Sequence, residues 1–258
     1  MFDEAHRVRE GLDLFVIPRF AQDVLGFDPA EFQTKLESNY PVRGADQHID
    51  PRVVQWVGGD NESLKYRGHA LKRAKMWLQR PEPDGRYRRY WYTGWQWKVL
   101  PATVGVDNCP EVLPIADRYD EWVADQGYPL ANHYICTRYA DGDHGIGFHS
   151  DKPNDIAPGS LITVVKTGAH GRPFQVCFPG EEKAPFFSEV LAPGTAVIMT
   201  LEANLATKYG VPVVDEAGPS GSIVFRTIDT LVPRETVSKE LRKRAREDRL
   251  ERDARVCA

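Results

Sequence analysis

The second half of the chain carries short apolar runs that are separated by turn residues. These runs are rich in Val, Ile and Phe, and Gly, Pro or Asp interrupts them at short intervals. In chain order they read HYICTRY, SLITVVKTGA, PFQVCF, EVLAPGTAVIMTL and GSIVFRTID. Because runs of this length, composition and spacing are typical of antiparallel strands, the pattern predicts a barrel or a sandwich over this half of the chain.

The first half combines one strand pattern with two helical ones. Residues 12–20, LDLFVIPRF, predict a short buried strand followed by a turn. Residues 28–38 begin with Asp-Pro and show helical apolar spacing, and residues 111–129 show the same period until a Gly and a Pro end it. Between the two predicted helices, residues 40–101 are polar, aromatic and rich in Gly and Pro, which predicts strands and long loops.

The composition is that of an ordinary soluble protein. The 258 residues are 41% hydrophobic and 27% charged with a net charge of −4, which excludes the disordered and fibrous classes and leaves a nucleic-acid partner open. No run of about 18 apolar residues occurs, so no membrane span is expected, and the charged N-terminus is unlike a signal peptide. The four cysteines lack CxxC spacing, which argues against a zinc site and a disulfide framework. We therefore expect an intracellular protein, cytoplasmic or nuclear.

The stretch RYADGDHGIGFHSDK places His149 and Asp151 two positions apart at the end of a glycine-punctuated run. On a strand, positions i and i+2 face the same side, so both side chains would point into one pocket. An imidazole and a carboxylate suit Fe(II) when a second histidine from a distant strand completes a facial triad and leaves the opposite side open. The pair alone is a weak signal for a metal site, and the short strands that follow it make the hypothesis more specific.

The segment NHYICTRYADGDHGIGFHSDK resembles the AlkB family of Fe(II)/2-oxoglutarate dioxygenases. The residues in register with the family pattern are Asn132, Tyr139, Gly142, His149 and Asp151. The preceding GYP and the later segments LITVVKTGA, LAPGTAVIM and SIVFR also occur in family order. The resemblance implies a mainly β fold with flanking helices (α+β), specifically a double-stranded β-helix or jelly roll.

The resemblance also implies a domain organisation. Residues 1–130 would form an N-terminal extension with helices and a substrate-recognition lid. Residues 131–232 would form the double-stranded β-helix core, and both parts belong to one integrated domain over residues 12–232. The highly charged residues 233–258 predict a helical tail that is solvated, weakly docked, or used to grip nucleic acid or a partner.

Iron and 2-oxoglutarate are the cofactors that the resemblance implies. His149 and Asp151 match two iron ligands of the family. Tyr139 matches a tyrosine that contacts 2-oxoglutarate, and Arg226 matches an arginine near the cosubstrate. A planar guanidinium suits a carboxylate because it donates two parallel hydrogen bonds to it.

Three positions depart from the family pattern. Tyr209, in ATKYGVP, stands where the family has its third iron ligand, a histidine, and no histidine follows His170. Ser220 stands where a second arginine pairs with the distal carboxylate of 2-oxoglutarate, and this exchange removes a charge-assisted pair worth about 1.5–3 kcal/mol. Thr137 replaces an asparagine. The predicted cosubstrate-binding residues are Thr137, Tyr139, Ser220, Ser222 and Arg226.

Three interpretations of the metal site stay open at this point. The Tyr209 phenolate could ligate iron, although phenolate favours the ferric state. Alternatively, His149 and Asp151 with water could hold a weaker metal site that uses a different reductant or another acid in place of 2-oxoglutarate. In the third interpretation the metal site is degenerate and the domain only binds.

The other histidines and the strand cysteines give no further ligand. His144 and His170 lie in glycine-containing turns and are expected at the surface. His133 lies on a predicted strand, where a core position and a pocket position are both open. Cys136 and Cys177 lie in strand patterns and are expected in the core.

An aromatic and basic region precedes the predicted core strands. Residues 86–98, RYRRYWYTGWQWK, contain four cationic and six aromatic side chains, and residues 65–77 add five Lys and Arg. Aromatic faces stack on unpaired bases, at about 1–3 kcal/mol each, and basic side chains contact phosphates. The place of this region before the core strands resembles the nucleotide-recognition lid of AlkB relatives, and this resemblance implies DNA or RNA that carries a modified base as a partner, although alternating aromatics also face cores. The predicted substrate-binding residues are Tyr66, Trp77, Tyr92 and Trp95.

Two functions follow from these observations. The first is an AlkB-like iron dioxygenase that hydroxylates or demethylates an alkyl group, with a modified nucleic-acid base as the leading substrate. The second is a catalytically inactive module of the same fold that binds nucleic acid or a small ligand.

Overall fold

The computed structural model describes residues 5–40, 53–58, 65–66, 69–70, 72–88 and 104–232 of the chain. Within these residues the larger sheet has nine strands, in the order β1-β2-β14-β11-β16-β9-β6-β3, with β8 beside β6. The strands of this large sheet are β1 (His6–Arg7), β2 (Leu14–Ile17), β3 (Val57–Gly58), β6 (Ala74–Gln79), β8 (Val104–Gly105), β9 (His133–Tyr139), β11 (Leu161–Gly168), β14 (Ala196–Thr200) and β16 (Ser220–Arg226).

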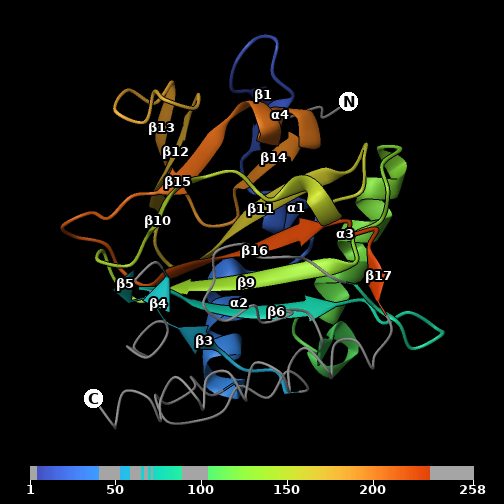
Figure 1. The fold of residues 1–258 in the computed structure, drawn as a ribbon. Helices are drawn as coiled ribbons and strands as arrows, with labels where there is room; N and C mark the ends of the chain where they lie inside the picture. The colour runs from blue at the N-terminus through green and yellow to red at the C-terminus, as the bar shows by residue number, and fades with distance from the viewer. Residues whose placement is uncertain are drawn as a thin grey trace, which may run out of the picture.

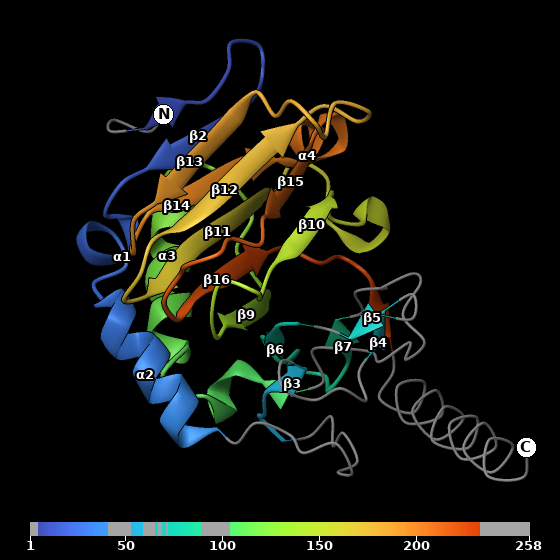
Figure 2. The same cartoon turned by 90° about the vertical axis from the view of Figure 1, so that its left-hand side faces the viewer.

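A small sheet packs against one side of the large sheet (Figures 1 and 2). Its order is β10-β15-β12-β13, and its strands are β10 (Ile146–His149), β12 (Arg172–Cys177), β13 (Phe187–Leu191) and β15 (Lys208–Val211). Two short pairs stand apart, β4 (Lys65–Tyr66) with β5 (His69–Ala70) and β7 (Tyr87–Arg88) with β17 (Leu231–Val232). From β9 to β16 the chain passes back and forth between the two sheets, and all sheet pairs in this span are antiparallel. This strand order is a double-stranded β-helix, so the predicted fold class is confirmed.

Helices α1 (Phe20–Asp23), α2 (Pro29–Asn39) and α3 (Leu113–Asp125) cover the other side of the large sheet. Helix α4 (Leu201–Ala206) follows β14 and contributes Leu201 and Ala203 to the core between the two sheets. The 3₁₀ turns are η1 (Val106–Asn108) and η2 (Pro153–Asp155). Asp28 caps α2 by accepting hydrogen bonds from the backbone N–H groups of Ala30 and Glu31, as its Asp-Pro start predicted. Gly127, with a φ of 80°, follows the end of α3. Both helix predictions are confirmed, whereas α4 was not anticipated. No helix in the described part of the chain is long and apolar enough to cross a membrane.

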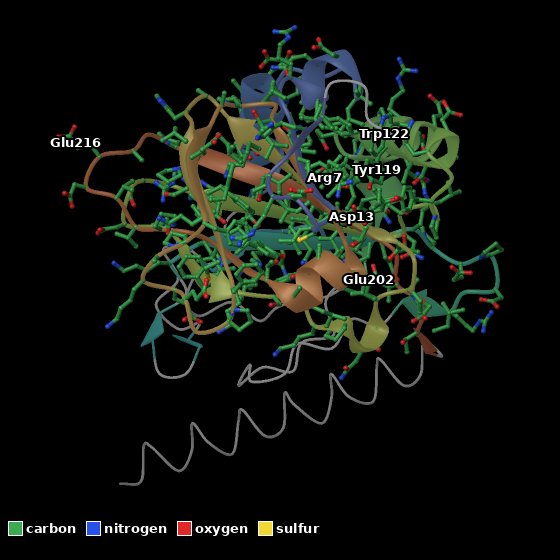
Figure 3. The ribbon with its side chains drawn as sticks, turned by 90° about the horizontal axis from the view of Figure 1, so that it is seen from above. Arg7, Asp13, Tyr119, Trp122, Glu202 and Glu216 are labelled. Carbon is green, nitrogen blue, oxygen red and sulfur yellow. The ribbon has the colours of Figure 1, made fainter. Side chains whose placement is uncertain are left out.

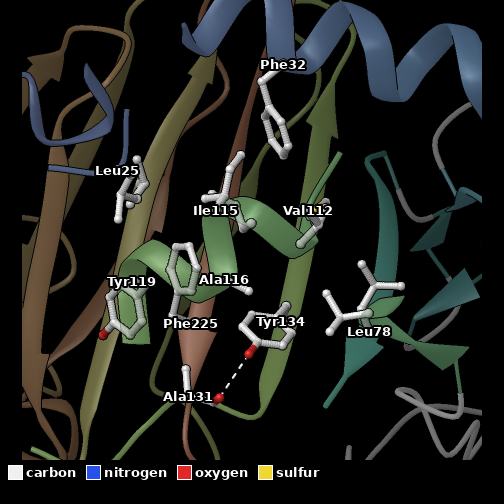
Figure 4. Close-up of a cluster of buried hydrophobic side chains, with 14 of the residues drawn as sticks. Leu25, Phe32, Leu78, Val112, Ile115, Ala116, Tyr119, Ala131, Tyr134 and Phe225 are labelled. Carbon is white, nitrogen blue, oxygen red and sulfur yellow. Dashed lines mark hydrogen bonds between the residues drawn. The ribbon is translucent and has the colours of Figure 1, made fainter. Parts of the chain in front are cut away.

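The hydrophobic core between α3 and the large sheet is built from aromatic contacts (Figure 4). The ring of Phe225 on β16 stacks on Tyr119 of α3, with centroids 4.1 Å apart, and meets the edge of Tyr134 on β9 at 5.9 Å. The Tyr119 hydroxyl lies 2.8 Å from the Thr163 hydroxyl of β11, and the Tyr134 hydroxyl donates to the Ala131 carbonyl. We call this helix-covered side the outer face.

Figure 3 shows Tyr119 beside Trp122 on α3, with Glu202 on α4 and Glu216 on the loop before β16.

A second hydrophobic core fills the space between the two sheets. It joins large-sheet residues such as Val164, Val224 and Ile135 to Phe174 and Val176 of the small sheet. We call this side of the large sheet the inner face. Because side chains alternate along a strand, every second residue of β6, β9, β11 and β16 points to the inner face. The predicted cosubstrate residues on β9 and β16 fall on this inner set.

Candidate functional site

Four rows of side chains cross the inner face of β11, β16, β9 and β6. One row is apolar and consists of Val164, Val224, Ile135 and Trp77. The next row is polar and consists of Lys166, Ser222, Thr137 and Lys75. Beyond the polar row, Ser220 pairs with Tyr139, and on the far side of the apolar row Arg226 pairs with His133, which pairs in turn with Gln79. The strand register therefore brings all five predicted cosubstrate residues to one buried face.

His149 ends β10 in the tautomer that a metal ligand needs. Its Nδ1 lies 2.9 Å from the carbonyl oxygen of Gly147. A carbonyl can only accept, so Nδ1 carries the proton and Nε2 keeps its lone pair. Burial, with smaller contributions from Lys75 and Arg73, lowers the pKa of His149 to about 4, although Asp151 acts in the opposite direction. The imidazole is therefore neutral at neutral pH.

Asp151 lies past the end of β10, so the expectation that a regular strand aligns it with His149 is wrong. The side-chain amide of Asn204, on α4, fixes the backbone instead: its Oδ1 accepts from the Asp151 N–H at 2.7 Å, and its Nδ2 donates to the Asp151 carbonyl at 3.0 Å. The Asp151 carboxylate forms an ion pair with Nη2 of Arg226 at 2.6 Å, and both side chains are only 5% exposed. Arg226 thus compensates the charge of the carboxylate that the sequence assigned to iron.

Tyr209 lies directly across from His149 on the neighbouring strand. The two residues are register partners of β10 and β15, and their ring centroids are 4.6 Å apart. The Tyr209 ring also stacks on Phe174 at 5.7 Å and is buried. At the next position, a Cβ on Gly210 would lie 2.8 Å from the Ile146 carbonyl oxygen, so this residue permits the close approach of the two strands.

The metal-binding capacity of this arrangement is partial. Among the described residues, no group of three His, Cys, Asp or Glu side chains is placed to hold a metal ion. His149 and Asp151 supply two donors of the kinds that non-haem iron takes, and the ring beside His149 on the neighbouring strand is a phenol. An iron site here would therefore need the Tyr209 phenolate or solvent as its further ligands.

The glycine-punctuated turn before β10 is organised by Arg172 of β12. Its guanidinium donates to the carbonyl oxygens of Asp141, Gly142, His144 and Pro212. The side chain of His144 is buried, and its Nδ1 accepts from the N–H of Ala140 at 3.1 Å, so its expected surface position is wrong. His170 is exposed, as predicted. Cys136 and Cys177 are both buried, as predicted.

The inner face carries more cations than the site residues predicted from the sequence. Lys75 is buried, and desolvation together with the nearby Arg73 and Arg226 lowers its pKa well below the ordinary lysine value. Lys166 is 1% exposed, and burial, with a smaller effect of Arg172, lowers its pKa to about 7. His133 is fully buried, and its pKa is lowered well below the ordinary value, mainly by desolvation and then by Arg226 and Lys75.

The structure describes the side chain of only one predicted substrate-binding residue, Trp77. Trp77 lies on β6, is 8% exposed, and belongs to the core between the sheets. Tyr92, Trp95 and the side chain of Tyr66 lie outside the described residues, as does the predicted tail 233–258. Their roles in substrate binding stay predictions.

Sequence reasoning missed three residues of this region. Asn204 holds Asp151, Arg172 holds the turn before β10, and Lys166 adds a buried charge. A lysine in the middle of the apolar run SLITVVKTGA was the one visible signal, because a charged residue is rarely placed inside a strand that is otherwise buried. Asn204 and Arg172 gave no comparable signal.

Comparisons with known proteins add a fold likeness. No family model and no curated protein matches the chain. Among solved structures, one titled "The structure of OsALKBH1" is similar over 86% of this chain and 99% of that chain, with 13% sequence identity and a TM-score of 0.47. A likeness at this level carries no information on ligands or reactions. The fold assignment therefore depends on the strand order described above. The description of the candidate site depends on the contacts of its own residues.

Proposed function

We propose that the protein is an AlkB-like non-haem iron oxygenase with an atypical site, which hydroxylates or demethylates an alkyl group on a modified nucleic-acid base. The observation that carries the proposal is the state of His149 inside a double-stranded β-helix. Its Nδ1–H is held by the Gly147 carbonyl, and its Nε2 lone pair is free of a proton at neutral pH. A neutral imidazole with a fixed tautomer is the form in which histidine binds metals.

The chain's own residues keep the donors in place. Asn204 fixes the backbone of Asp151, and the Ser150 hydroxyl donates to the Thr207 carbonyl at 2.5 Å, so the loop after β10 is tied to the segment between α4 and β15. Arg226 fixes the position of the Asp151 carboxylate by pairing with it. When bound, iron would supply oxygen activation, and 2-oxoglutarate or another acid would supply electrons.

Tyr209 makes the proposed site atypical. A phenolate is an accepted iron ligand that favours the ferric state, so the proposal includes a slower return to ferrous iron than a histidine would allow. Tyr209→His would place an imidazole on the same strand position across from His149. We expect this variant to bind Fe(II) more tightly and to turn over faster.

The proposal is tested by anaerobic titration with Fe(II), followed by oxygen, 2-oxoglutarate and an oligonucleotide that carries N-methylated bases. The expected results are one iron per chain, release of succinate and formaldehyde in equal amounts, and a phenolate-to-iron(III) absorption band after oxidation. Tyr209→Phe keeps the ring and should lose the band, whereas His149→Ala should lose iron binding. Wild-type protein that takes up no iron would refute the proposal.

One observation favours a second candidate, a catalytically inactive module that binds nucleic acid or a small ligand. The Asp151 carboxylate already has a buried cationic partner, so it needs no metal to balance its charge. Oligonucleotide binding without iron uptake, unchanged in His149→Ala, would select this candidate over the oxygenase.

A further inference from the structure

Three residues from three strands lie beside the buried ring of Tyr139 on the inner face. Lys166 Nζ lies 5.4 Å from the centroid of the Tyr139 ring, and Cζ of Arg172 lies 5.6 Å from the same centroid. Ser220 is the register partner of Tyr139 on β16. We call Lys166, Arg172, Tyr139 and Ser220 the Lys166 cluster. Each of its members is buried.

The Lys166 cluster contains two basic side chains, and neither forms an ion pair with a carboxylate among the described residues. The ion pairs found in that part of the chain include neither Lys166 nor Arg172. A buried ammonium without a counter-charge costs several kcal/mol, unlike a surface lysine. A lysine kept at this cost needs a reason outside the stability of the fold.

Three polar atoms of the cluster make no hydrogen bond within the described residues. They are Lys166 Nζ, Ser220 Oγ and Arg172 Nε, and all three are buried. The terminal nitrogens of Arg172 donate to four backbone carbonyls, whereas its Nε makes no hydrogen bond. An ammonium, a hydroxyl and a guanidinium N–H are all donors, and they match an acceptor with several lone pairs such as a carboxylate.

Positive charge continues from the cluster toward the candidate metal site. Lys75 lies in the same row as Lys166, separated from it by Ser222 and Thr137, and its electrostatic neighbours are Arg73, Arg226 and Asp151. Basic side chains thus lie at both ends of the polar row. An acid held at the cluster by one carboxylate would extend along this row toward the Arg226–Asp151 pair, where a second carboxylate would also lie near basic groups.

We propose that the Lys166 cluster binds one carboxylate of a small dicarboxylic acid, and that Lys166 supplies the charge that selects this acid. The proposal deepens the proposed function, because the acid would be the cosubstrate of the same site, and it rests on that function for this role. The proposal also gives Ser220 a role. This residue of β16 offers a hydroxyl group to the carboxylate, and Lys166 of β11 supplies the positive charge. A lysine is a point charge, so it holds the carboxylate without the two-point geometry of an arginine.

The test compares two acids on two proteins. The acids are 2-oxoglutarate and 2-oxopentanoate, which has the same chain length without the distal carboxylate. Their Kd values are measured by calorimetry in EDTA and again with Mn(II), on wild type and on Lys166→Met. Wild type should bind 2-oxoglutarate about tenfold more tightly than 2-oxopentanoate, and Lys166→Met should lose this preference.

Matched variants separate this role from a general effect of charge or folding. Lys35→Met, on the exposed face of α2, should keep the preference. Lys166→Arg should keep most of it, and Ser220→Arg in the Lys166→Met background should restore it by returning a cation to the cluster. Near-ultraviolet circular dichroism reports whether each variant is folded.

The outcomes are separable from those of the proposed function. A preference for the distal carboxylate in EDTA that depends on Lys166 supports the inference even if no iron binds. Wild type that binds neither acid, that binds both equally, or that keeps its preference in a folded Lys166→Met variant overturns the inference. The Fe(II) titration and the turnover assay would still test the proposed function separately.

Discussion

The two faces of the large sheet use the same strands for opposite purposes. On the outer face, β16 and β9 present Phe225, Ile223, Tyr134 and Cys136, all of them buried in one apolar core. On the inner face, the same two strands present Arg226, Ser222, Ser220 and Thr137, together with apolar residues between them. Their neighbours β11 and β6 add Lys166 and Lys75 to this inner face.

The difference shows where the protein gives up stability. Apolar side chains could fill the inner face as they fill the outer one, and replacing buried charges by packed hydrophobic residues is often neutral or stabilising. Buried cations kept beside an otherwise regular core therefore mark the face that binds something. The following predictions test this contrast, beginning with the largest expected effect.

Truncation on the outer face should damage stability alone. Phe225→Ala removes a fully buried ring that contacts Tyr119 and Tyr134, and we expect a loss of about 3–5 kcal/mol in the free energy of unfolding. Urea denaturation measures this loss. At a temperature where the variant stays folded, its Kd for Mn(II) should equal that of wild type. A weaker affinity for Mn(II) would contradict the separation of stability and binding between the two faces.

Loss of the buried ion pair should affect stability and metal binding together. Asp151→Asn removes the carboxylate partner of Arg226 while both side chains stay buried, so we expect a loss of about 3 kcal/mol and loss of metal binding. Glu182→Gln is the matched control, because it breaks the more exposed pair with Lys208, where solvent screening makes the loss much smaller. Equal costs for the two variants would contradict the assigned burial of the Asp151 pair.

Two asparagines allow a sharper comparison. The Asn204 amide bonds the N–H and carbonyl of Asp151, and the Asn132 amide bonds the N–H and carbonyl of Ile228 in the same way. Each Ala variant should cost about 2 kcal/mol in urea denaturation, because buried backbone groups lose their partners. Only Asn204→Ala should also weaken metal binding. Equal metal affinities in the two variants would argue against a positioning role for Asn204.

Lys166→Met should stabilise the protein by about 1 kcal/mol near neutral pH. Burial lowers the pKa of Lys166 from the ordinary 10.5 to about 7, so between these values the unfolded chain binds more protons than the folded one. The wild-type free energy of unfolding therefore falls as the pH falls through this window. Denaturation at about pH 7 and about pH 9.5, without carboxylate buffers, should show a larger advantage of the variant at the lower pH. An advantage that does not change with pH would argue against a pKa of Lys166 that is lowered by burial.

Much of the fold could be predicted from local patterns. The runs HYICTRY and SLITVVKTGA became β9 and β11, the Asp-Pro start became the cap of α2, and the helical period after residue 111 became α3. These predictions succeed because periodicity, caps and β-branched composition act within a few residues. The short helix α4 was not predicted, since it occupies six residues between two strands and depends on its neighbours.

For the candidate site, too, some features could be predicted from the sequence and others depend on the tertiary structure. The amino-acid sequence by itself determined which donors are present, namely His149 and Asp151 two positions apart, Tyr209, Ser220, and a lysine inside an apolar strand. Only the tertiary structure placed Tyr209 across from His149, gave Arg226 to Asp151, and brought Lys166, Arg172 and Ser220 to one ring. These contacts join strands far apart in the chain, and their geometry is set by sheet register and by burial, which no local pattern records.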